Sequence, residues 1–260
     1  MAIVVLGAGG RLGQLLRPVF PVEALWHSRK DVDIEDTDTL CHALAQADAA
    51  ICLAGATIGS ARAMQLNVTL AVRVLDAAQA AGAGRVLLFS SAAVYGRASG
   101  LLSEDTPAGP VHPYGVAKLQ IEAMAAQHSH PNTAIRLGNV AGADAILGGW
   151  KPGFSLDTLP DGTTPMRSYI GPMRLAQVLN DLCNALHLRT NINVAAPGVV
   201  EMGALLDAAG LAWSRRPATD QTIAHVQMDT THLIEVTNFA AADRTAQGIV
   251  TGWQTTKAAQ

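Results

Sequence analysis

Apolar residues in this chain follow two alternating patterns: short continuous runs, and longer stretches in which they recur every three or four positions. The runs are typical of strands buried on both faces, and the longer stretches are typical of helices with one buried face. The predicted strands cover residues 3–6, 24–26, 49–53, 86–89, 133–137 and 192–195. The clearest predicted helices cover residues 12–19, 70–78, 114–126 and 175–186. This alternation predicts an α/β fold, a Rossmann-type doubly wound parallel sheet covered by helices.

One segment, residues 142–165, interrupts the alternation. It is rich in Gly, Pro and Asp and has no clear period. Loops of this length are uncommon as passive connections in compact domains, so we interpret the segment as either a substrate loop or a partly mobile one. We therefore expect a single domain over residues 1–260. Residues 1–140 would mainly bind a dinucleotide, and about 141–170 plus 198–260 would form a small C-terminal substrate lobe.

Composition narrows the possible partners. The chain is 49% hydrophobic with a formal net charge of -3, and it has no run of Lys or Arg, so we expect no nucleic-acid partner. No apolar stretch is long enough to cross a membrane, and the apolar start lacks the basic leader of a signal peptide. Three scattered cysteines fit a reducing compartment. We therefore expect a cytoplasmic protein without a metal site.

A glycine-rich segment, Gly7 to Gly13, follows the first predicted strand and precedes a helix. Gly7 permits a tight turn, Gly10 lets the backbone approach a pyrophosphate, and Gly13 allows close helix packing. The first backbone N–H groups of the helix, around Arg11 and Leu12, would bind the phosphates. Glycine triplets also occur in flexible turns, but the position between a strand and a helix favours a nicotinamide dinucleotide site.

The second predicted strand ends without the acidic residue that usually binds the ribose of NAD. Ser28 and Arg29 stand there instead, and a guanidinium suits the 2′-phosphate of NADP. Asp33 and Ile34 are expected to flank the adenine. We therefore expect NADP to be the preferred cofactor and NAD the alternative. A shift of the strand end by one or two residues would bring Asp31 to the ribose and favour NAD. Arg29 could also be a surface arginine that does not contact the cofactor. Ala54, Gly55 and Ala56 follow the third strand, and these small residues would leave room for the ribose and diphosphate. Leu53, the last residue of that strand, is also expected to contact the cofactor.

Candidate acid–base chemistry comes from Tyr114 and Lys118, which lie four residues apart and so share one face of a helix. A phenol with its ordinary pKa of about 10 is a poor base at neutral pH. A nearby ammonium should lower that pKa, and the hydroxyl of Ser90 or Ser91, at a strand end, could hold the reacting oxygen. Together the three residues would move a proton to or from a carbonyl or secondary alcohol. A Tyr/Lys pair can also be a simple surface pair.

In this order, the motifs resemble those of the extended short-chain dehydrogenase/reductase family, the NAD(P)-dependent epimerase/dehydratase group. The matching segments are the glycines at 7, 10 and 13, Asn67, residues 90–96, 114–118, 136–142 and 167–170. The resemblance implies Tyr114 as acid/base, Lys118 as pKa modulator and ribose anchor, and Ser91 as partner of the substrate oxygen. It also implies cofactor contacts by Leu137, Gly138 and Val140, and substrate contacts by Ser91, Ala92, Asn139 and Arg167. A homodimer is implied as well, joined through the helices that follow Asn67 and contain Tyr114.

Departures from the family pattern narrow the chemistry. Where family dehydratases carry acidic residues after the strand-end serine, this chain has Ala92 and Ala93, which cannot transfer a proton. We therefore expect an oxidoreductase or redox-type epimerase acting on a secondary hydroxyl or ketone of a sugar-like or nucleotide-sugar substrate. Segment 142–165 offers little material for holding a nucleotide, which favours a smaller substrate. The alternative is a non-catalytic NADP-binding regulatory protein of the same fold.

Overall fold

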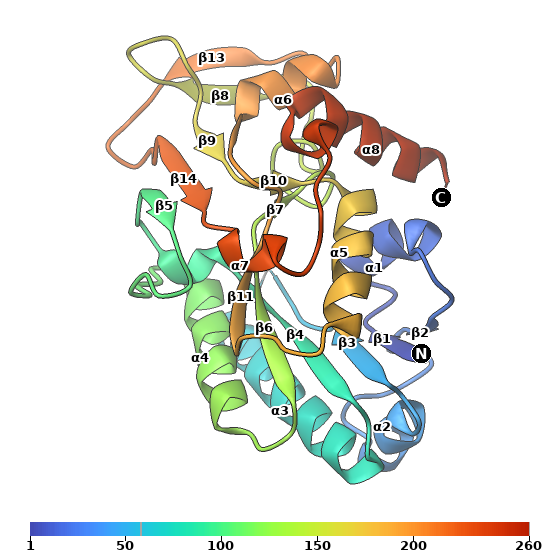
Figure 1. The fold of residues 1–260 in the computed structure, drawn as a ribbon. Coiled ribbons are helices and arrows are strands. Elements are labelled where there is room, and N and C mark those ends of the chain that lie inside the picture. Colours follow the sequence, from blue (N-terminus) through green and yellow to red (C-terminus); the bar gives the residue numbers. More distant parts are fainter. Residues whose placement is uncertain (58, 260) are drawn as a thin grey trace.

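The centre of the molecule is a six-stranded parallel sheet, seen in a computed structural model that describes residues 1–57 and 59–259. Its strand order is β11-β6-β4-β3-β1-β2 (Figure 1). The strands are β1 (Ile3–Leu6), β2 (Leu25–His27), β3 (Ala49–Cys52), β4 (Arg85–Ser91), β6 (Asn132–Leu137) and β11 (Asn191–Val194). All residues of β1 and β3 are buried, as expected for strands covered on both faces. The predicted fold class is confirmed.

Helices cover both faces of this sheet. One face packs against α2 (Thr37–Leu44), α3 (Ala61–Ala81) and α4 (Pro113–Gln127). The other packs against α1 (Arg11–Leu16), α5 (Pro172–Asn184) and α7 (Thr231–Ile234). From β1 the chain first moves outward to β2 and then returns to the other side of β1 with β3. In such sheets the ligand crevice lies at this switch point, at the carboxyl ends of the strands.

The ends of three elements, β2, α3 and α5, differ from the predicted ones. Strand β2 begins and ends one residue later than predicted. Helix α3 begins well before residue 70, because the Ser60 side chain accepts a hydrogen bond from the Ala63 N–H and caps it. Helix α5 ends at Asn184, so the prediction that it includes Leu186 is wrong; that side chain is 88% exposed.

A second group of elements lies beyond the carboxyl ends of the main strands (Figure 1). It contains a four-stranded sheet of order β12-β9-β14-β5 and two pairs of strands, β10-β7 and β13-β8. Its helices α6 and α8 share an apolar cluster with Tyr169, Leu147 and Trp253. The bounds of its elements are β5 (Gly100–Leu102), β7 (Asn139–Val140), β8 (Ser155–Thr158), β9 (Met166–Arg167), β10 (Tyr169–Ile170), β12 (Val200–Glu201), α6 (Met202–Ala208), β13 (Ser214–Pro217), β14 (His225–Met228), η3 (Ala241–Arg244) and α8 (Ala246–Ala258). The short helices η1 (Arg17–Val19) and η2 (Ala92–Tyr95) directly follow α1 and β4.

Segment 142–165 is more ordered than its composition predicts. Its start is held by Asp144, whose carboxylate accepts the backbone N–H groups of Ile146, Leu147 and Gly148. Asp144 also accepts a hydrogen bond of 2.8 Å from the hydroxyl of Tyr169. Further along, β8 pairs with β13 in parallel. Arg11 on α1 donates from Nη1 to the Ala143 carbonyl oxygen at 3.1 Å, which holds the beginning of the segment close to the carboxyl end of β1.

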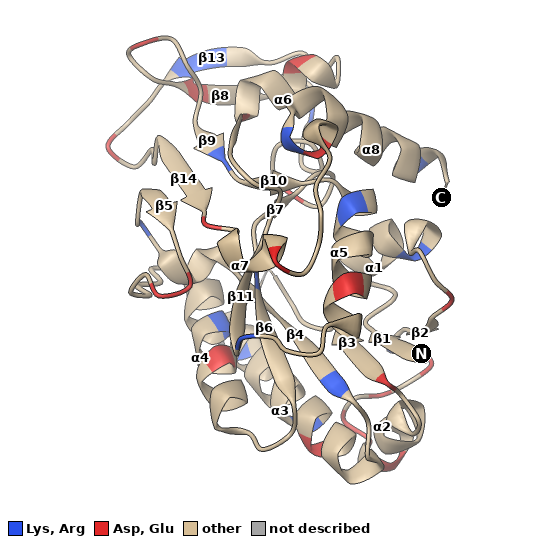
Figure 2. Cartoon of the chain, viewed as in Figure 1, with Lys and Arg blue, Asp and Glu red and all other residues tan. Residues whose placement is uncertain are grey.

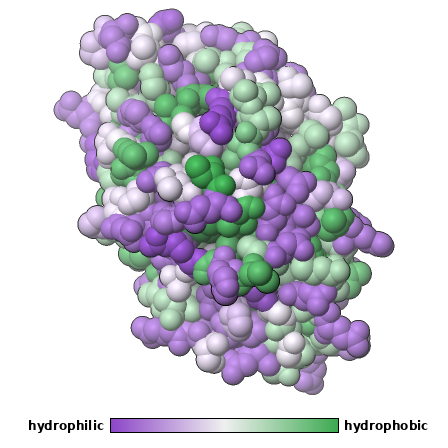
Figure 3. All heavy atoms as spheres, in the orientation of Figure 1, coloured by the Kyte–Doolittle hydropathy of each residue, from purple (hydrophilic) through white to green (hydrophobic). Residues whose placement is uncertain are grey.

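Charged residues of both signs are spread over both groups of elements (Figure 2). The face shown in Figure 3 mixes hydrophilic and hydrophobic residues in small patches. Across residues 1–57 and 59–259, no helix has both the length and the apolar character needed to cross a membrane. The same residues contain no group of three His, Cys, Asp or Glu side chains placed to hold a metal ion.

Candidate active site

Two neighbouring pockets at the carboxyl ends of the main strands share part of their lining. The larger has a volume of about 740 Å³ and the smaller about 390 Å³. They share the loops that follow β1 and β3, so a ligand could extend through both. The larger pocket is lined by the predicted residues Ser28, Arg29, Asp33 and Ile34. The smaller one is lined by Arg11, Leu12, Gly13, Ser91, Tyr114, Lys118, Leu137, Gly138, Asn139 and Val140, and both by Gly7, Gly10, Leu53, Ala54 and Gly55.

The glycine loop after β1 has the shape that a bound diphosphate requires. Gly7 has φ +95°, and a Cβ atom there would lie 2.7 Å from the backbone nitrogen of Ala54. The loops after β1 and β3 can therefore approach each other only because this residue is glycine. Gly10 precedes α1, and no side chain caps that helix. Its first N–H groups thus have no side-chain acceptor, which fits an anionic ligand.

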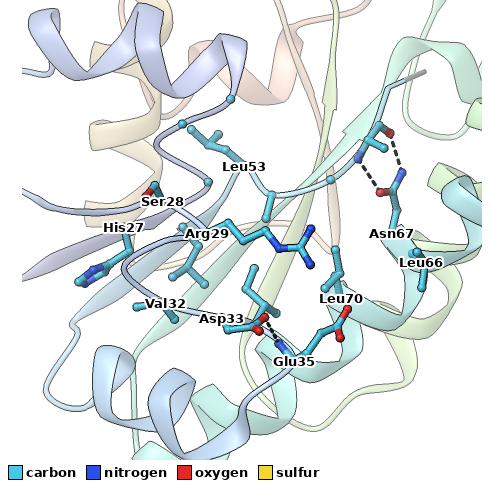
Figure 4. Close-up of a pocket in the computed structure, with 18 of the residues that line it drawn as sticks. His27, Ser28, Arg29, Val32, Asp33, Glu35, Leu53, Leu66, Asn67 and Leu70 are labelled. Atoms are coloured by element: carbon cyan, nitrogen blue, oxygen red, sulfur yellow. Dashed lines mark hydrogen bonds between the residues drawn. The ribbon is translucent and has the colours of Figure 1, made fainter. Parts of the chain in front are cut away.

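Asn67 on α3 fixes the loop after β3. This buried side chain donates from Nδ2 to the Ala56 carbonyl oxygen and accepts the Ala56 N–H at Oδ1, both at 2.8 Å (Figure 4). Sequence reasoning placed Asn67 in a motif but gave it no role. The residues around Asn67 could not reveal its hydrogen bonds with Ala56, because Ala56 lies eleven residues earlier in the chain.

The turn after β2 corrects one predicted role. The Ser28 hydroxyl donates to Asp31 Oδ2 at 2.6 Å, and the Ser28 N–H donates to the same oxygen at 2.8 Å. Ser28 is therefore used inside the turn and is not free to donate to a phosphate. These hydrogen bonds hold the pKa of Asp31 below its ordinary value. Arg29 and Lys30 are exposed at the turn, and Figure 4 shows the Arg29 side chain reaching across the pocket.

Tyr114 and Ser91 come together because α4 packs closely on the segment after β4. A Cβ atom at Gly115 would lie 2.6 Å from the Ala93 carbonyl oxygen, so this close approach also depends on glycine. The buried Lys118 donates from Nζ to the Phe89 carbonyl oxygen at 2.6 Å. Its Nζ lies 5.6 Å from the centre of the Tyr114 ring. The three predicted catalytic residues thus line one pocket.

The electrostatics of this group differ from the prediction for Tyr114. Burial raises the pKa of Tyr114 above its ordinary value, and a hydrogen bond with Ser91 acts in the opposite direction without reversing the shift. The predicted lowering of this pKa is therefore wrong for the structure as described. Burial also lowers the pKa of Lys118, to about 8. At neutral pH the phenol is protonated and the ammonium is still largely charged.

Two predicted substrate residues are not brought to either pocket. Arg167 donates to the carbonyl oxygens of Met166 and Ile223, both at 2.7 Å, so its guanidinium serves the small four-stranded sheet. Ala92 packs in an apolar cluster with Tyr95. Conversely, the pockets include residues that the sequence does not predict as site residues: Gly9, Lys30, Glu35, Thr57, Leu70, Phe89, Ala143 and Asp144. Most of these come from loops with no motif of their own.

Comparison with known proteins identifies the family of this chain. Residues 3–149, more than half of the chain, match the family model described as the NAD dependent epimerase/dehydratase family. The chain belongs to this family. The resemblance drawn from the motifs is therefore confirmed.

The chain is also similar in sequence or structure to individual known proteins. A UDP-glucose 4-epimerase from Azospirillum brasilense is 34% identical over 153 residues, which cover 47% of this chain and 43% of the relative. The chain thus matches less than half the length of that relative. The crystal structure of a UDP-glucose 4-epimerase from Brucella ovis in complex with NAD has TM-score 0.80 at 18% identity and 96% coverage of both chains. The structure of RMD from Pseudomonas aeruginosa complexed with NADPH has TM-score 0.72 at 19% identity, covering 98% of this chain and 99% of that one. At such low identity, these two structures show the fold alone.

Proposed function

We propose that this protein is a nicotinamide-dependent oxidoreductase or redox-type epimerase acting on a secondary hydroxyl or ketone of a sugar-like or nucleotide-sugar substrate. One observation carries the proposal: Ser91, Tyr114 and Lys118 line the smaller pocket, and this pocket shares the glycine loop after β1 with the larger one. Family membership supports the cofactor class, and the 34% identical UDP-glucose 4-epimerase supports the substrate class.

Within this proposal, the chain's own residues move the proton. When bound, the nicotinamide supplies hydride chemistry. The Tyr114 hydroxyl would give its proton to a ketone oxygen, or its phenolate would take one from a substrate hydroxyl. Since burial raises the pKa of Tyr114, the protonated form, which can donate to a ketone oxygen, predominates at neutral pH. Ser91 would orient the same oxygen, and Lys118 would hold the ribose and favour the phenolate when it forms.

The competing proposal, a non-catalytic NADP-binding regulator, makes a different prediction in one experiment. The purified protein is incubated with NADP or NAD and with UDP-glucose, UDP-N-acetylglucosamine or free sugars, while absorbance at 340 nm and the NMR spectrum of the sugar are followed. Cofactor reduction, or an inverted carbon without net reduction, supports the enzyme. Tight cofactor binding without conversion of any of these compounds would favour the regulator.

For the cofactor, we propose a preference for NADP over NAD that depends on Arg29. The residue lies at the exposed end of the larger pocket together with Lys30. The nearest acid after β2, Asp31, is engaged by Ser28 within its own turn. A guanidinium in this position can pair with the 2′-phosphate of NADP, while Asp31 is not free to bind the ribose diol of NAD. Asp33 and Glu35 also line the pocket, and Asp33 is expected to flank the adenine.

Arg29→Ala is expected to weaken NADP binding by about ten- to a hundred-fold, since a charge-assisted hydrogen bond contributes roughly 1.5–3 kcal/mol. NAD binding should stay unchanged, because NAD has no 2′-phosphate. Isothermal titration with both cofactors measures this. Arg244→Ala, at an exposed position on η3 outside both pockets, controls for the loss of one positive charge. Tighter NAD than NADP binding in the wild type, or equal losses for both cofactors in Arg29→Ala, would contradict the proposal.

We also propose a homodimer and a substrate position between the main sheet and the lobe of residues 141–170 and 198–260. Helices α3 and α4 pack side by side. Val116 and Met124, eight residues apart on α4, are 42% and 44% exposed, and a second copy of the chain could cover these apolar side chains. Ala143 and Asp144 already bring the start of segment 142–165 to the smaller pocket. A cytoplasmic location stays a prediction.

A further inference from the structure

A buried ion pair lies behind the proposed reacting groups and has no part in the proton transfer described above. Glu122 on α4 and Arg136 on β6 are only 4% and 5% exposed. Arg136 donates from Nη2 to Glu122 Oε2 at 2.7 Å and from Nε to Oε1 at 3.0 Å. Neither residue lines the described pockets.

Further hydrogen bonds extend this pair into a network. Ser90 donates from its hydroxyl to Glu122 Oε1 at 2.5 Å. The third guanidinium nitrogen of Arg136, Nη1, donates to the Tyr95 hydroxyl at 3.1 Å, and that hydroxyl donates to Asn193 Oδ1 at 2.7 Å. The contacts connect α4, β4, β6, η2 and β11, so they link the neighbouring strands β11, β6 and β4 to one helix.

Each central member of this network is adjacent in sequence to a site residue, or one helical turn from it. Ser90 precedes Ser91 at the end of β4 and itself lines the smaller pocket. Glu122 follows Lys118 by four residues on α4, so the two share a helix face. Arg136 precedes Leu137, which lines the smaller pocket. A shift of α4 along the sheet would therefore have to break these contacts.

Stability alone is a weak explanation for such a pair. Removing two charges from water is costly, and buried ion pairs can often be replaced by apolar residues of similar volume without loss of stability. Directional hydrogen bonds, in contrast, fix the relative position of the groups that make them. We propose that the Ser90–Glu122–Arg136 network has a positioning role. It fixes the end of β4 relative to α4 and thereby places Ser91 against Tyr114.

The inference rests on the proposed function for the role of Tyr114, but it can be tested without turnover. The chain has three tyrosines, and they report on three places. Tyr114 reports on the site, Tyr95 on the network, and Tyr169, bonded to Asp144, on a region outside it. Tyrosine labelled with ¹³C at Cζ gives one NMR signal for each, assigned by single Tyr→Phe variants. Ser91→Ala defines the position of the Tyr114 signal when the hydrogen bond is lost.

Two variants disturb the network. Ser90→Ala removes the link between β4 and Glu122 and leaves the ion pair intact. The double variant Glu122→Leu/Arg136→Met removes both charges together, and thermal melting checks its folding. In both variants we expect the Tyr114 signal to move toward its position in Ser91→Ala, while the Tyr169 signal stays in place. In the double variant the Tyr95 signal should move as well.

The proposal is overturned if the Tyr114 signal keeps its wild-type position in Ser90→Ala, or keeps it in a folded double variant whose Tyr95 signal has moved. Ser90→Ala decides alone if the double variant does not fold. A purely structural network would lower the melting temperature of these variants without moving the Tyr114 signal. Failure of the proposed function would show separately, as absence of turnover in the wild-type protein while the tyrosine signals still respond.

Discussion

Replacement of Tyr114 by phenylalanine is expected to lower turnover by about 10²- to 10⁴-fold, the contribution typical of a positioned acid or base. The half-buried ring would keep its packing in the variant, because only the hydroxyl is removed. No other phenol lines the described pockets, and the neighbouring Ala92 and Ala93 cannot carry a proton. The substrate oxygen would then have no donor in the position that Ser91 and Tyr114 share.

The measurement is kcat for whichever sugar substrate the wild type converts, together with the dissociation constant of the cofactor. Cofactor affinity should remain at its wild-type value, since the phenol hydroxyl is assigned to the substrate. This combination separates a lost proton path from a damaged cofactor site. A Tyr114→Phe enzyme that retains wild-type kcat would show that another group supplies the proton.

The sequence is sufficient to predict the main sheet, because the burial of each central strand is visible in the strand's own residues. Strands β1 and β3 are buried on both faces, and burial of every position produces the continuous apolar runs from which they were predicted. Boundaries were less predictable where exposure varies. Strand β2 is an edge strand with exposed Leu25, which weakens its pattern and explains the shift of one residue. The end of α5 before Leu186 likewise depends on the extended backbone at Ala185.

The site was predictable where its residues belong to contiguous motifs and unpredictable where tertiary contacts decide. The glycine loop and the Tyr114/Lys118 face follow from spacing alone. The role of Asp144 depends on its contacts with later backbone N–H groups and with Tyr169. The raised pKa of Tyr114 depends on burial, which spacing does not reveal. The network behind Ser91 joins residues up to 98 positions apart, as in the Tyr95–Asn193 hydrogen bond.

Replacement of Lys118 by methionine is expected to weaken cofactor binding and turnover together, each by about ten- to a hundred-fold, the equivalent of roughly 1.5–3 kcal/mol for a charge-assisted hydrogen bond. The ammonium is proposed to hold the ribose and to favour the phenolate of Tyr114, so both quantities should fall. Folding should be retained. Burial opposes the charge of Lys118, as its lowered pKa shows, and methionine fills a similar volume without a charge.

The pH dependence of NAD binding identifies this ammonium in the wild-type protein. Its pKa of about 8 means that Lys118 is charged below pH 8 and loses the charge as the pH rises through that value. NAD affinity should therefore be constant below pH 7 and decline above pH 8; NAD is the suitable probe because it lacks a 2′-phosphate that titrates. The groups near Lys118 do not interfere, since burial raises the pKa of both Cys52 and Tyr114. Lys118→Met should bind NAD weakly and without this decline, and a decline that persists in the variant would assign it to another group.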